Sequence, residues 1–201
     1  EQQLSACRVL PVLTARDADS TLRTAQALMT GGMQVVEITL RTPAALECLQ
    51  MVKSELPQLT VAAGTVTDAA SVHAALDAGA DFCVSPGISP EMIAACAERG
   101  VHFLPGVATP SEVILGLSHG LAMFKLFPAV AIGGLDLLRS LGGPFPDARF
   151  CPTGGLTADN FREFLALSNV ICCGGSWMVS SELVDNGRWD DIEALARAAL
   201  A

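Results

Sequence analysis

The stretch VVEITLRTPAALECLQMVKSELPQLTVAAGT, residues 35–65, contains the pattern that decides the fold. It opens with the apolar run Val35–Leu40 and closes with a second run, Thr60–Thr65. Between the two runs, apolar residues recur at the spacing of one helix face. These residues are Ala45, Leu49, Val52 and Leu56. The stretch therefore predicts a strand, a helix and a second strand.

Similar apolar runs recur along the whole chain of 201 residues, and their starts lie 20 to 26 residues apart. The expected strands are Val9–Thr14, Val35–Leu40, Thr60–Thr65, Phe82–Ser85, His102–Val107, Met123–Phe127, Arg149–Thr153 and Val170–Cys173. Helix starts are indicated where a capping hydroxyl precedes a proline. This occurs at Thr42-Pro43, Ser89-Pro90 and Thr109-Pro110. Glycines after the helical segments indicate helix ends.

Eight such units without a break in composition predict an α/β protein, a single (β/α)8 TIM barrel domain over residues 1–201. An open doubly wound sheet could be built from the same units. No Gly-x-Gly-x-x-Gly follows the first strand, which argues against that alternative. In a barrel the chemistry belongs at the carboxyl ends of the strands, so the residues there are the candidates.

Composition limits the kind of protein and its partners. Hydrophobic residues make up 51% of the chain and charged residues 16%, so a large core can form. The apolar runs are too short for a membrane-spanning helix, and no secretory signal is visible. A net charge of −9 argues against nucleic acid or an anionic membrane as a partner.

The cysteines and histidines predict neither a disulfide framework nor a metal site. The seven cysteines are odd in number, lack a Cys-x-x-Cys pair and mostly lie in apolar segments. We interpret them as reduced, structural thiols of a cytoplasmic protein. The three histidines, His73, His102 and His119, show no metal-ligand spacing, so we expect no metal.

A buried lysine is the main candidate for chemistry. Because side chains alternate along a strand, Glu37 and Arg41 should point into the barrel, and so should Lys125. Burial disfavours a charged ammonium, and a neutral amine attacks carbonyls and forms Schiff bases. Glu37 would then move protons. The alternative is that Lys125 is only the structural counter-ion of Glu37. The chain's other lysine, Lys53, is expected to be an ordinary solvated residue.

Two glycine clusters at the ends of the last two strands suggest an anion site. They are Thr153-Gly154-Gly155 and Gly174-Gly175-Ser176. Barrels frequently bind phosphate there with bare backbone N–H groups, although two glycines often form only a turn. Because the net charge is −9, local positive groups would have to hold an anion. The candidates are Arg16, Arg41 and Lys125. Thr65 could hold a carboxylate, and Pro86 could form a wall of the pocket.

Five short motifs, in order and at these separations, resemble the 2-keto-3-deoxy-6-phosphogluconate (KDPG) aldolase family. They are residues 36–42, 64–66, 124–129, 149–155 and 174–177. The resemblance implies a metal-free class I aldolase without a cofactor, usually a homotrimer. It would act in the Entner–Doudoroff pathway and cleave KDPG to pyruvate and glyceraldehyde 3-phosphate.

The resemblance also implies roles for individual residues. Lys125 corresponds to the Schiff-base lysine and Glu37 to the acid/base. Arg41 and Thr65 correspond to residues that hold the carboxylate end of the substrate. The phosphate site corresponds to Thr153, Gly154, Gly155 and Ser176, with Gly175 in the same cluster. Arg16 falls where some members place another basic residue, and Phe127 and Pro86 correspond to pocket walls.

Other functions remain compatible with the sequence. The same chemistry could act on the 6-phosphogalactonate epimer or on 4-hydroxy-2-oxoglutarate, which lacks phosphate. In a phosphosugar isomerase or epimerase, Glu37 would abstract a proton and Lys125 would only polarise a carbonyl. A non-catalytic phosphometabolite-binding module is the third alternative, although such a module has no need of a nucleophilic amine.

Overall fold

The computed structural model describes residues 7–201, and its strands are all parallel where they pair. The strands are β1 (Val9–Thr14), β2 (Val35–Thr39), β3 (Thr60–Gly64), β4 (Phe82–Val84), β5 (His102–Leu104), β6 (Gly106–Val107), β7 (Met123–Leu126), β8 (Arg149–Pro152) and β9 (Cys173–Gly175). Six of them form a sheet in the order β5-β4-β3-β2-β1-β9, and three form a sheet in the order β6-β7-β8.

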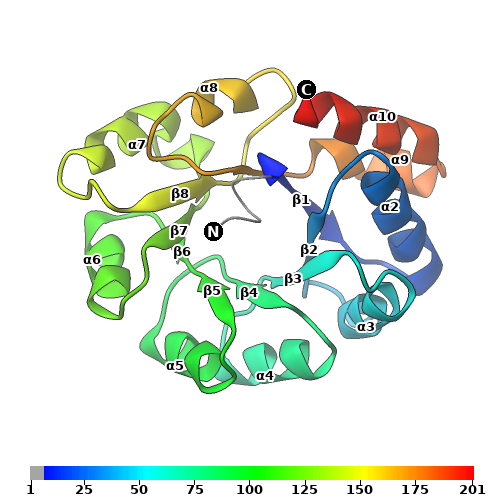
Figure 1. Cartoon of the computed structure of the whole chain (residues 1–201), viewed down its shortest axis with the longest axis horizontal. Coiled ribbons are helices and arrows are strands. Elements are labelled where there is room, and N and C mark those ends of the chain that lie inside the picture. Colours follow the sequence, from blue (N-terminus) through cyan, green and yellow to red (C-terminus); the bar gives the residue numbers. More distant parts are fainter. Residues whose placement is uncertain (1–6) are drawn as a thin grey trace.

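Helices follow the strands and lie on the outside of the curled sheets (Figure 1). The helices are α2 (Ala18–Thr30), α3 (Ala45–Glu55), α4 (Ala69–Asp77), α5 (Pro90–Glu98), α6 (Pro110–Ser118), α7 (Gly134–Gly142), α8 (Phe161–Leu165), α9 (Ser181–Asp185) and α10 (Trp189–Leu200), with short 3-10 turns η1 (Val130–Ile132) and η2 (Trp177–Val179). The predicted α/β architecture with a curled parallel sheet is confirmed. No helix in this described part of the chain could cross a membrane.

The two sheets are connected at both of their edges. Between β5 and β6 the chain passes through Pro105, which lacks an N–H group for a ladder. The carbonyl of Pro105 still accepts a hydrogen bond from Lys125 N at 2.8 Å. Isolated parallel bridges join Phe150 to Val170 and Thr153 to Gly174, beside β8 and β9. The carboxyl ends of the strands are thereby brought to one side of the molecule.

Successive side chains along the strands point to opposite faces, and each face carries its own apolar cluster. The larger cluster lies between strands and helices and includes Val36, Ile38 and Phe124. The smaller cluster lies on the opposite face of the strands, and it includes Leu10 and Val35. Since successive side chains point to opposite faces, Glu37 shares the face of Val35.

Three expectations about local structure are wrong. The last strand is Cys173–Gly175 instead of Val170–Cys173, because it is the later segment that pairs with β1. Thr42 does not cap a helix: its hydroxyl donates to Ala15 O at 2.6 Å, and α3 begins only at Ala45. Lys53 is not simply solvated, because its ammonium bonds Asp81 at 2.8 Å and Leu59 O at 3.2 Å.

Helix boundaries otherwise follow the predicted capping chemistry. Ser89 accepts from Met92 N, and Thr109 forms a capping box with Glu112. Gly32, Gly79, Gly100 and Gly120 follow helix ends with positive φ angles of 100°, 96°, 66° and 79°. Residues with a Cβ rarely adopt this conformation, so glycine is the natural choice at these four positions.

The cysteines are all buried, as expected from their apolar surroundings. Burial raises the pKa of the Cys173 thiol and also that of the Cys48 thiol. A raised pKa leaves less of the reactive thiolate. These two cysteines therefore behave as small apolar residues of the core.

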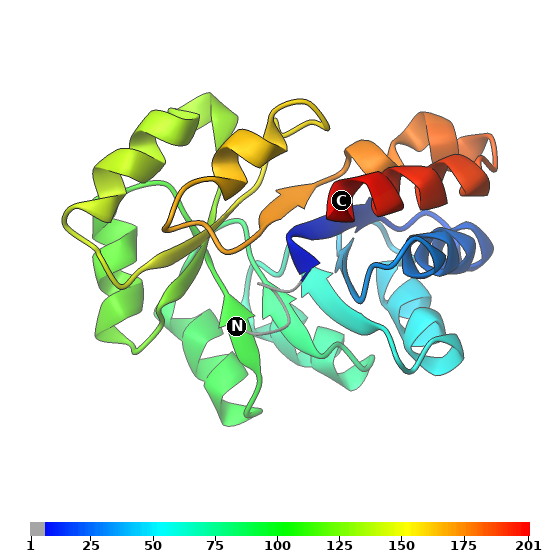
Figure 2. The same cartoon turned by 45° about the horizontal axis from the view of Figure 1, so that its top comes forward.

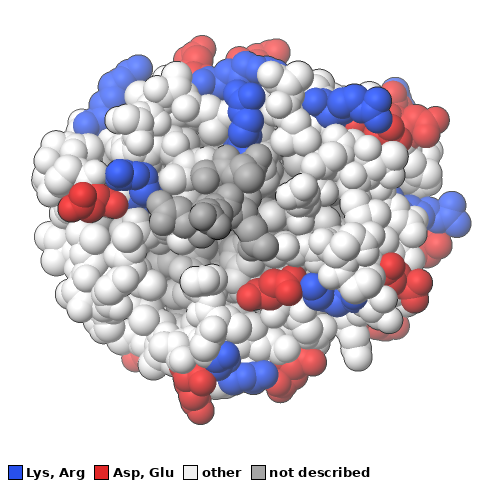
Figure 3. Space-filling view, in the orientation of Figure 1, with Lys and Arg blue, Asp and Glu red and all other residues white. Residues whose placement is uncertain are grey.

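The two ends of the described chain are held against each other. Helix α10 lies beside α2 in both ribbon views (Figure 2). The approach is close at Gly31, where an added Cβ would lie 2.6 Å from Ala196 Cβ. Figure 3 shows one face of the molecule, on which basic and acidic side chains lie mostly near the rim, many of them as close neighbours. Outside residues 1–6, the basic side chains form no extended patch on this face.

Candidate active site

A buried ion pair joins two strands of different sheets. Lys125 of β7 donates from Nζ to Glu37 of β2, at 2.9 Å to Oε1 and 3.1 Å to Oε2. The side chains are 5% and 0% exposed, respectively. Taking both charges out of water costs as much free energy as such a pair usually returns, so burial of the pair is weak evidence for a stabilising role. The predicted inward orientation of both residues is confirmed, and an amine lies beside a carboxylate in a site shielded from water.

A glycine in the neighbouring strand makes room for the Glu37 carboxylate. Strand β3 pairs with β2 so that Gly64 stands opposite Thr39. A Cβ added at Gly64 would lie 2.6 Å from Glu37 Cγ and 2.7 Å from Cδ, and it would overlap Oε1. A residue with a Cβ at this strand position would therefore collide with the Glu37 side chain, which explains the glycine.

The aromatic ring of Phe127 lies next to the lysine. Lys125 Nζ is 5.7 Å from the ring centroid. Phe127 follows β7 directly and is half-buried. An ammonium at this distance from a ring face is attracted by the ring quadrupole. The ring therefore borders the amine on the side toward the open end of the strands.

Arg41 and Thr65 form a second polar pair after β2 and β3. Arg41 Nε donates to Thr65 Oγ1 at 3.1 Å. Thr65 has a φ of 62°, a left-handed conformation that is costly for a β-branched residue. Within residues 7–201 Arg41 has no carboxylate partner, so its remaining N–H groups are available to an anion. Strained residues of this kind cluster at functional sites.

A cavity of about 160 Å³ opens at the carboxyl ends of the strands. Its lining includes eight of the residues singled out from the sequence: Arg41, Phe127, Thr153, Gly154, Gly155, Gly174, Gly175 and Ser176. The structure therefore brings the two glycine clusters together, and it places the Arg41 guanidinium on the same cavity.

Glycines also shape this cavity. A Cβ at Gly174 would overlap the Thr153 hydroxyl, which donates to Cys151 O at 3.3 Å. Gly154 and Gly155 have φ angles of 100° and 81°, which glycine adopts without strain. The turn after β8 can thus present backbone N–H groups to a ligand at close range.

Five predicted residues lie outside the cavity lining: Lys125, Glu37, Thr65, Pro86 and Arg16. Thr65 contacts Arg41, as described. Pro86 is half-buried, and its backbone packs against Gly106, the residue that pairs with Lys125. Arg16 points to α9, where it bonds Asp185 and Ser181. The predicted anion contact of Arg16 stays a prediction, since Asp185 engages its guanidinium here.

The whole chain matches a known family. The family model described as "KDPG and KHG aldolase" matches residues 1–195. The 2-dehydro-3-deoxy-phosphogluconate aldolase of Pseudomonas aeruginosa is 46% identical over 194 residues, which cover 96% of this chain and 88% of the relative. The KHG/KDPG aldolase of Escherichia coli is 40% identical over 200 residues, covering 100% and 94%. This chain belongs to the KDPG and KHG aldolase family.

Solved structures of the family have the same fold. KDPG aldolase from Legionella pneumophila, captured with pyruvate as a covalent carbinolamine intermediate, is 40% identical with a TM-score of 0.96 and covers 98% of this chain and 96% of its own. KDPG aldolase from Zymomonas mobilis, solved with 3-phosphoglycerate, is 40% identical with a TM-score of 0.94 and covers 100% and 94%.

Sequence reasoning missed several residues of this aldolase-family site. Val12, Thr14 and Leu156 line the cavity, and Gly64 accommodates Glu37. The signal for Val12 and Thr14 was present: both alternate with the outward-facing Leu13 in the first strand. Gly64 gave no such signal, because its neighbour lies 27 positions away in the sequence.

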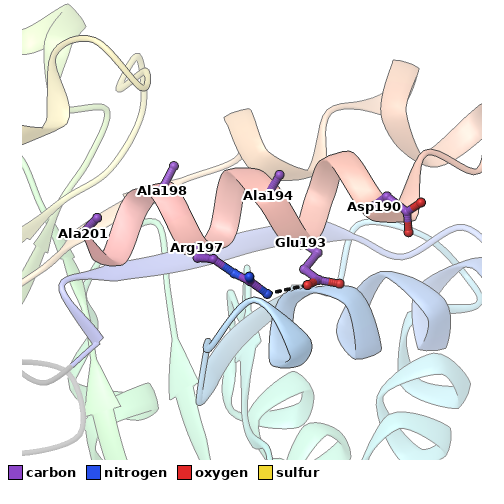
Figure 4. A pocket seen from close by; sticks show the side chains of 6 residues that line it. All are labelled: Asp190, Glu193, Ala194, Arg197, Ala198 and Ala201. Atoms are coloured by element: carbon purple, nitrogen blue, oxygen red, sulfur yellow. Dashed lines mark hydrogen bonds and ion pairs between the residues drawn. The ribbon is translucent and has the colours of Figure 1, made fainter.

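A larger hollow elsewhere offers no convergent chemistry. It has a volume of about 600 Å³ and lies along a single helix, α10 (Figure 4). Its alanine side chains point to one side of the helix, whereas Glu193 and Arg197 pair with each other on another side. Among residues 7–201, no group of three or more His, Cys, Asp or Glu side chains is placed to hold a metal ion. The candidate site is therefore the cavity at the carboxyl ends of the strands, whose Phe127 ring also borders Lys125.

Proposed function

We propose that this protein is a class I aldolase that cleaves KDPG to pyruvate and glyceraldehyde 3-phosphate in the Entner–Doudoroff pathway. The buried Lys125–Glu37 pair, with Nζ 2.9 Å from Oε1, carries the proposal. The family relatives named KDPG aldolase, and the relative that holds pyruvate as a carbinolamine, support it.

Imine formation is the first part of the proposed reaction. The Lys125 ammonium passes one proton to Glu37, and the neutral amine attacks the C2 carbonyl of the keto acid. The second N–H proton moves to the carbonyl oxygen, which gives a carbinolamine. Glu37 then returns its proton to the hydroxyl group of the carbinolamine. This group departs as water, and an iminium ion forms at C2.

Carbon–carbon cleavage uses the iminium ion as an electron sink. Glu37 accepts the proton of the C4 hydroxyl, and the electrons of the C3–C4 bond move into the iminium to form an enamine. Glyceraldehyde 3-phosphate leaves as the aldehyde. Protonation of the enamine at C3 and hydrolysis of the resulting imine release pyruvate and restore the amine. The iminium ion is the electron sink for the cleavage, so the proposed mechanism needs neither a metal nor another cofactor.

The polar groups around the lysine suggest how the substrate is oriented. We assign the substrate carboxylate to Arg41 and Thr65, and the phosphate to Thr153, Gly154, Gly155, Gly175 and Ser176. Phe127 and Pro86 would border the carbon chain between them. Arg41 and both glycine clusters line the same cavity, which supports a substrate with an anionic group at each end.

The decisive experiment traps the imine. The protein is incubated with pyruvate and borohydride, and its intact mass and peptide map are measured. Reduction of the imine should add about 72 Da at the activated amine. The chain has only two lysines, so a map that places the adduct on Lys125 supports the mechanism. An unmodified chain, or labelling only at Lys53 and the N-terminus, contradicts it.

A lysine substitution separates the aldolase from an isomerase or epimerase. Lys125→Arg keeps a positive charge but cannot form the imine. An aldolase loses both turnover and trapping in this variant. Retained turnover would favour a mechanism in which Lys125 only polarises a carbonyl. Stabilisation by ligand without any turnover would favour a binding module.

The choice of aldehyde partner is tested with three substrates. Cleavage of KDPG, of its 6-phosphogalactonate epimer and of 4-hydroxy-2-oxoglutarate should be compared. Inorganic phosphate at roughly 1–10 mM should compete with a phosphorylated substrate at a weak anion site. Without such competition, 4-hydroxy-2-oxoglutarate becomes the favoured substrate.

We further propose one closed (β/α)8 barrel domain over residues 1–201. The bridges between Phe150 and Val170 and between Thr153 and Gly174 support closure beside β8 and β9. The continuous chain through Pro105 supports closure at the other junction. A single cooperative unfolding transition is expected for one domain, and two separated transitions would contradict it.

We propose a cytoplasmic homotrimer. The seven buried cysteines favour a reducing compartment. Ile114 and Leu117 of α6 are 57% and 37% exposed and could contribute to a subunit contact, whereas the number three rests on family resemblance. Light scattering should give three times the chain mass of 20.9 kDa, and a mass of one or two chains would contradict the trimer.

A further inference from the structure

One hydroxyl on the cavity wall has no role so far. Thr14 is the last residue of β1, is exposed and lines the cavity together with Arg41 and Ser176. Within residues 7–201 its side chain makes no hydrogen bond. A hydroxyl that lines a pocket without a protein partner is free to bind a ligand.

The direction of the Thr14 side chain follows from the strand period. Leu10 belongs to the inner apolar cluster, Val12 lines the cavity, and Thr14 continues the same row toward the open end. Leu13 points the other way, into the outer cluster. The inner face of β1 thus changes from apolar to polar at the level where the cavity opens.

The position of β1 in the sheet decides which part of a substrate Thr14 can reach. On one side β1 pairs with β9, which contains Gly174 and Gly175 and is followed by Ser176. On the other side it pairs with β2, where Thr14 stands opposite Thr39, two residues before Arg41. Thr14 therefore lies between the Gly174–Ser176 cluster and Arg41, which we assign to opposite ends of the substrate.

We infer that Thr14 is a specificity-determining residue, whose hydroxyl binds the polar chain of the aldehyde half of the substrate, beyond the C3–C4 bond. This inference rests on the proposed aldolase function. The ligand atoms are a hydroxyl or a phosphate oxygen of that half. Pyruvate lacks the aldehyde half, so its reaction with Lys125 does not involve Thr14.

The test compares Thr14→Val, which removes the hydroxyl but keeps the shape, with Thr14→Ser, which keeps the hydroxyl. For KDPG cleavage Thr14→Val should lower kcat/KM by about 3- to 10-fold, the worth of one neutral hydrogen bond, mainly through KM. Thr14→Ser should restore it. The rate of borohydride trapping with pyruvate should stay at the wild-type value in both variants.

Controls separate binding from folding. Thr30→Val removes a hydroxyl that bonds Gln26 O on α2, away from the cavity, and should leave kcat/KM unchanged. If the loss in Thr14→Val persists with the non-phosphorylated six-carbon acid, the partner is a chain hydroxyl. If the loss occurs only with the phosphorylated acid, the partner is the phosphate.

Two results would overturn the inference. One is an unchanged kcat/KM for KDPG in Thr14→Val, and the other is an equal loss in pyruvate trapping, which indicates a structural effect. Failure of the aldolase proposal itself looks different, because the wild-type protein would then trap no pyruvate.

Discussion

The pairing of Lys125 with Glu37 sets the first prediction at the residue scale. Glu37→Gln keeps the size of the side chain but removes the group that accepts protons. We expect kcat for KDPG cleavage to fall by about 10²- to 10⁴-fold, the usual contribution of a general base. The Lys125 imine with pyruvate should still be trapped by borohydride, only more slowly.

The control for this prediction is Glu163→Gln on α8, an exposed carboxylate that is not part of the cavity. Its steady-state rate should equal that of the wild type. A Glu37→Gln enzyme with wild-type kcat would mean that another group moves the protons.

Gly64 gives a second prediction at this scale, because it packs against Glu37 but does not line the cavity. In Gly64→Ala the new Cβ would occupy the space of the Glu37 carboxylate. We expect Glu37 to be displaced from Lys125, and kcat to fall by about 10-fold or more, as in other cases of a misplaced catalytic group. Single-turnover trapping with pyruvate measures the effect on imine formation.

Gly87→Ala is the matched control, since nothing lies within 4 Å of a Cβ added there. That variant should keep wild-type turnover. Full activity in Gly64→Ala would show that the carboxylate tolerates displacement. Loss of the folded state, seen by circular dichroism, would show that the strand and not the carboxylate failed.

At the scale of elements, the side chains that cap two helices make the stability of the fold depend on pH in the acidic range. Asp68 accepts hydrogen bonds from Ser71 at the start of α4, first from its backbone N–H, and these bonds hold the pKa of Asp68 below its usual 3.8. Hydrogen bonds from Ser20 likewise lower the pKa of Asp17 at the start of α2. Folding is therefore favoured by both carboxylates while they are ionised.

The sign of the pH effect follows from these lowered pKa values. As the pH falls, the unfolded chain takes up its protons first, near pH 3.8, so this part of the stability is present above that pH. It is lost as the pH falls through the lower pKa values of the folded protein. Asp68→Asn keeps a good cap without the charge, so its urea midpoint should fall less between pH 5 and pH 3 than that of the wild type. An equal fall would contradict this prediction.

Elements show how far the sequence alone could lead. Strand Val9–Thr14 was predicted to the residue, because its apolar and β-branched residues are preceded by Arg8 and followed, after Ala15, by Arg16. The last strand was misplaced, because Gly174 and Gly175 have poor strand propensity. Glycine is required at both positions for a steric reason. The Thr153 side chain occupies the space that a Cβ of Gly174 would take, and the Trp177 side chain occupies the space that a Cβ of Gly175 would take.

The same limit applies to single side chains. The hydroxyl of Thr42 binds Ala15 O, and the ammonium of Lys53 binds Asp81, partners 27 and 28 residues away. A local pattern contains no information on such partners. Strand alternation, by contrast, requires no knowledge of partners, and it placed both Lys125 and Glu37 on the inner face.

At the scale of the whole molecule, the contact of α2 with α10 joins the two ends of the described chain. Gly31→Ala would place a Cβ 2.6 Å from Ala196 Cβ and 2.7 Å from Glu193 O, although the backbone at Gly31, with φ of −71°, tolerates alanine. We expect overpacking to lower the free energy of unfolding by about 1–3 kcal/mol, measured by urea denaturation.

A substitution on α7 provides the comparison. A Cβ at Gly142 would lie no closer than 3.5 Å to its nearest neighbour, Asn169 Nδ2, so Gly142→Ala should be neutral or slightly stabilising. Pyruvate trapping should be normal in the folded form of both variants, because neither position lines the cavity. Equal stability of Gly31→Ala and the wild type would mean that α10 can move away from α2 at no cost.

The 2.9 Å contact between Lys125 and Glu37 has a calorimetric consequence. The proton that the amine must lose is accepted within the site, and the same proton leaves with the water molecule. Formation of the iminium therefore exchanges no net proton with the solution. The heat of pyruvate binding should then be the same in phosphate-free buffers of different ionisation enthalpy. A heat that varies with the buffer would show that the proton comes from, or goes to, the surrounding water.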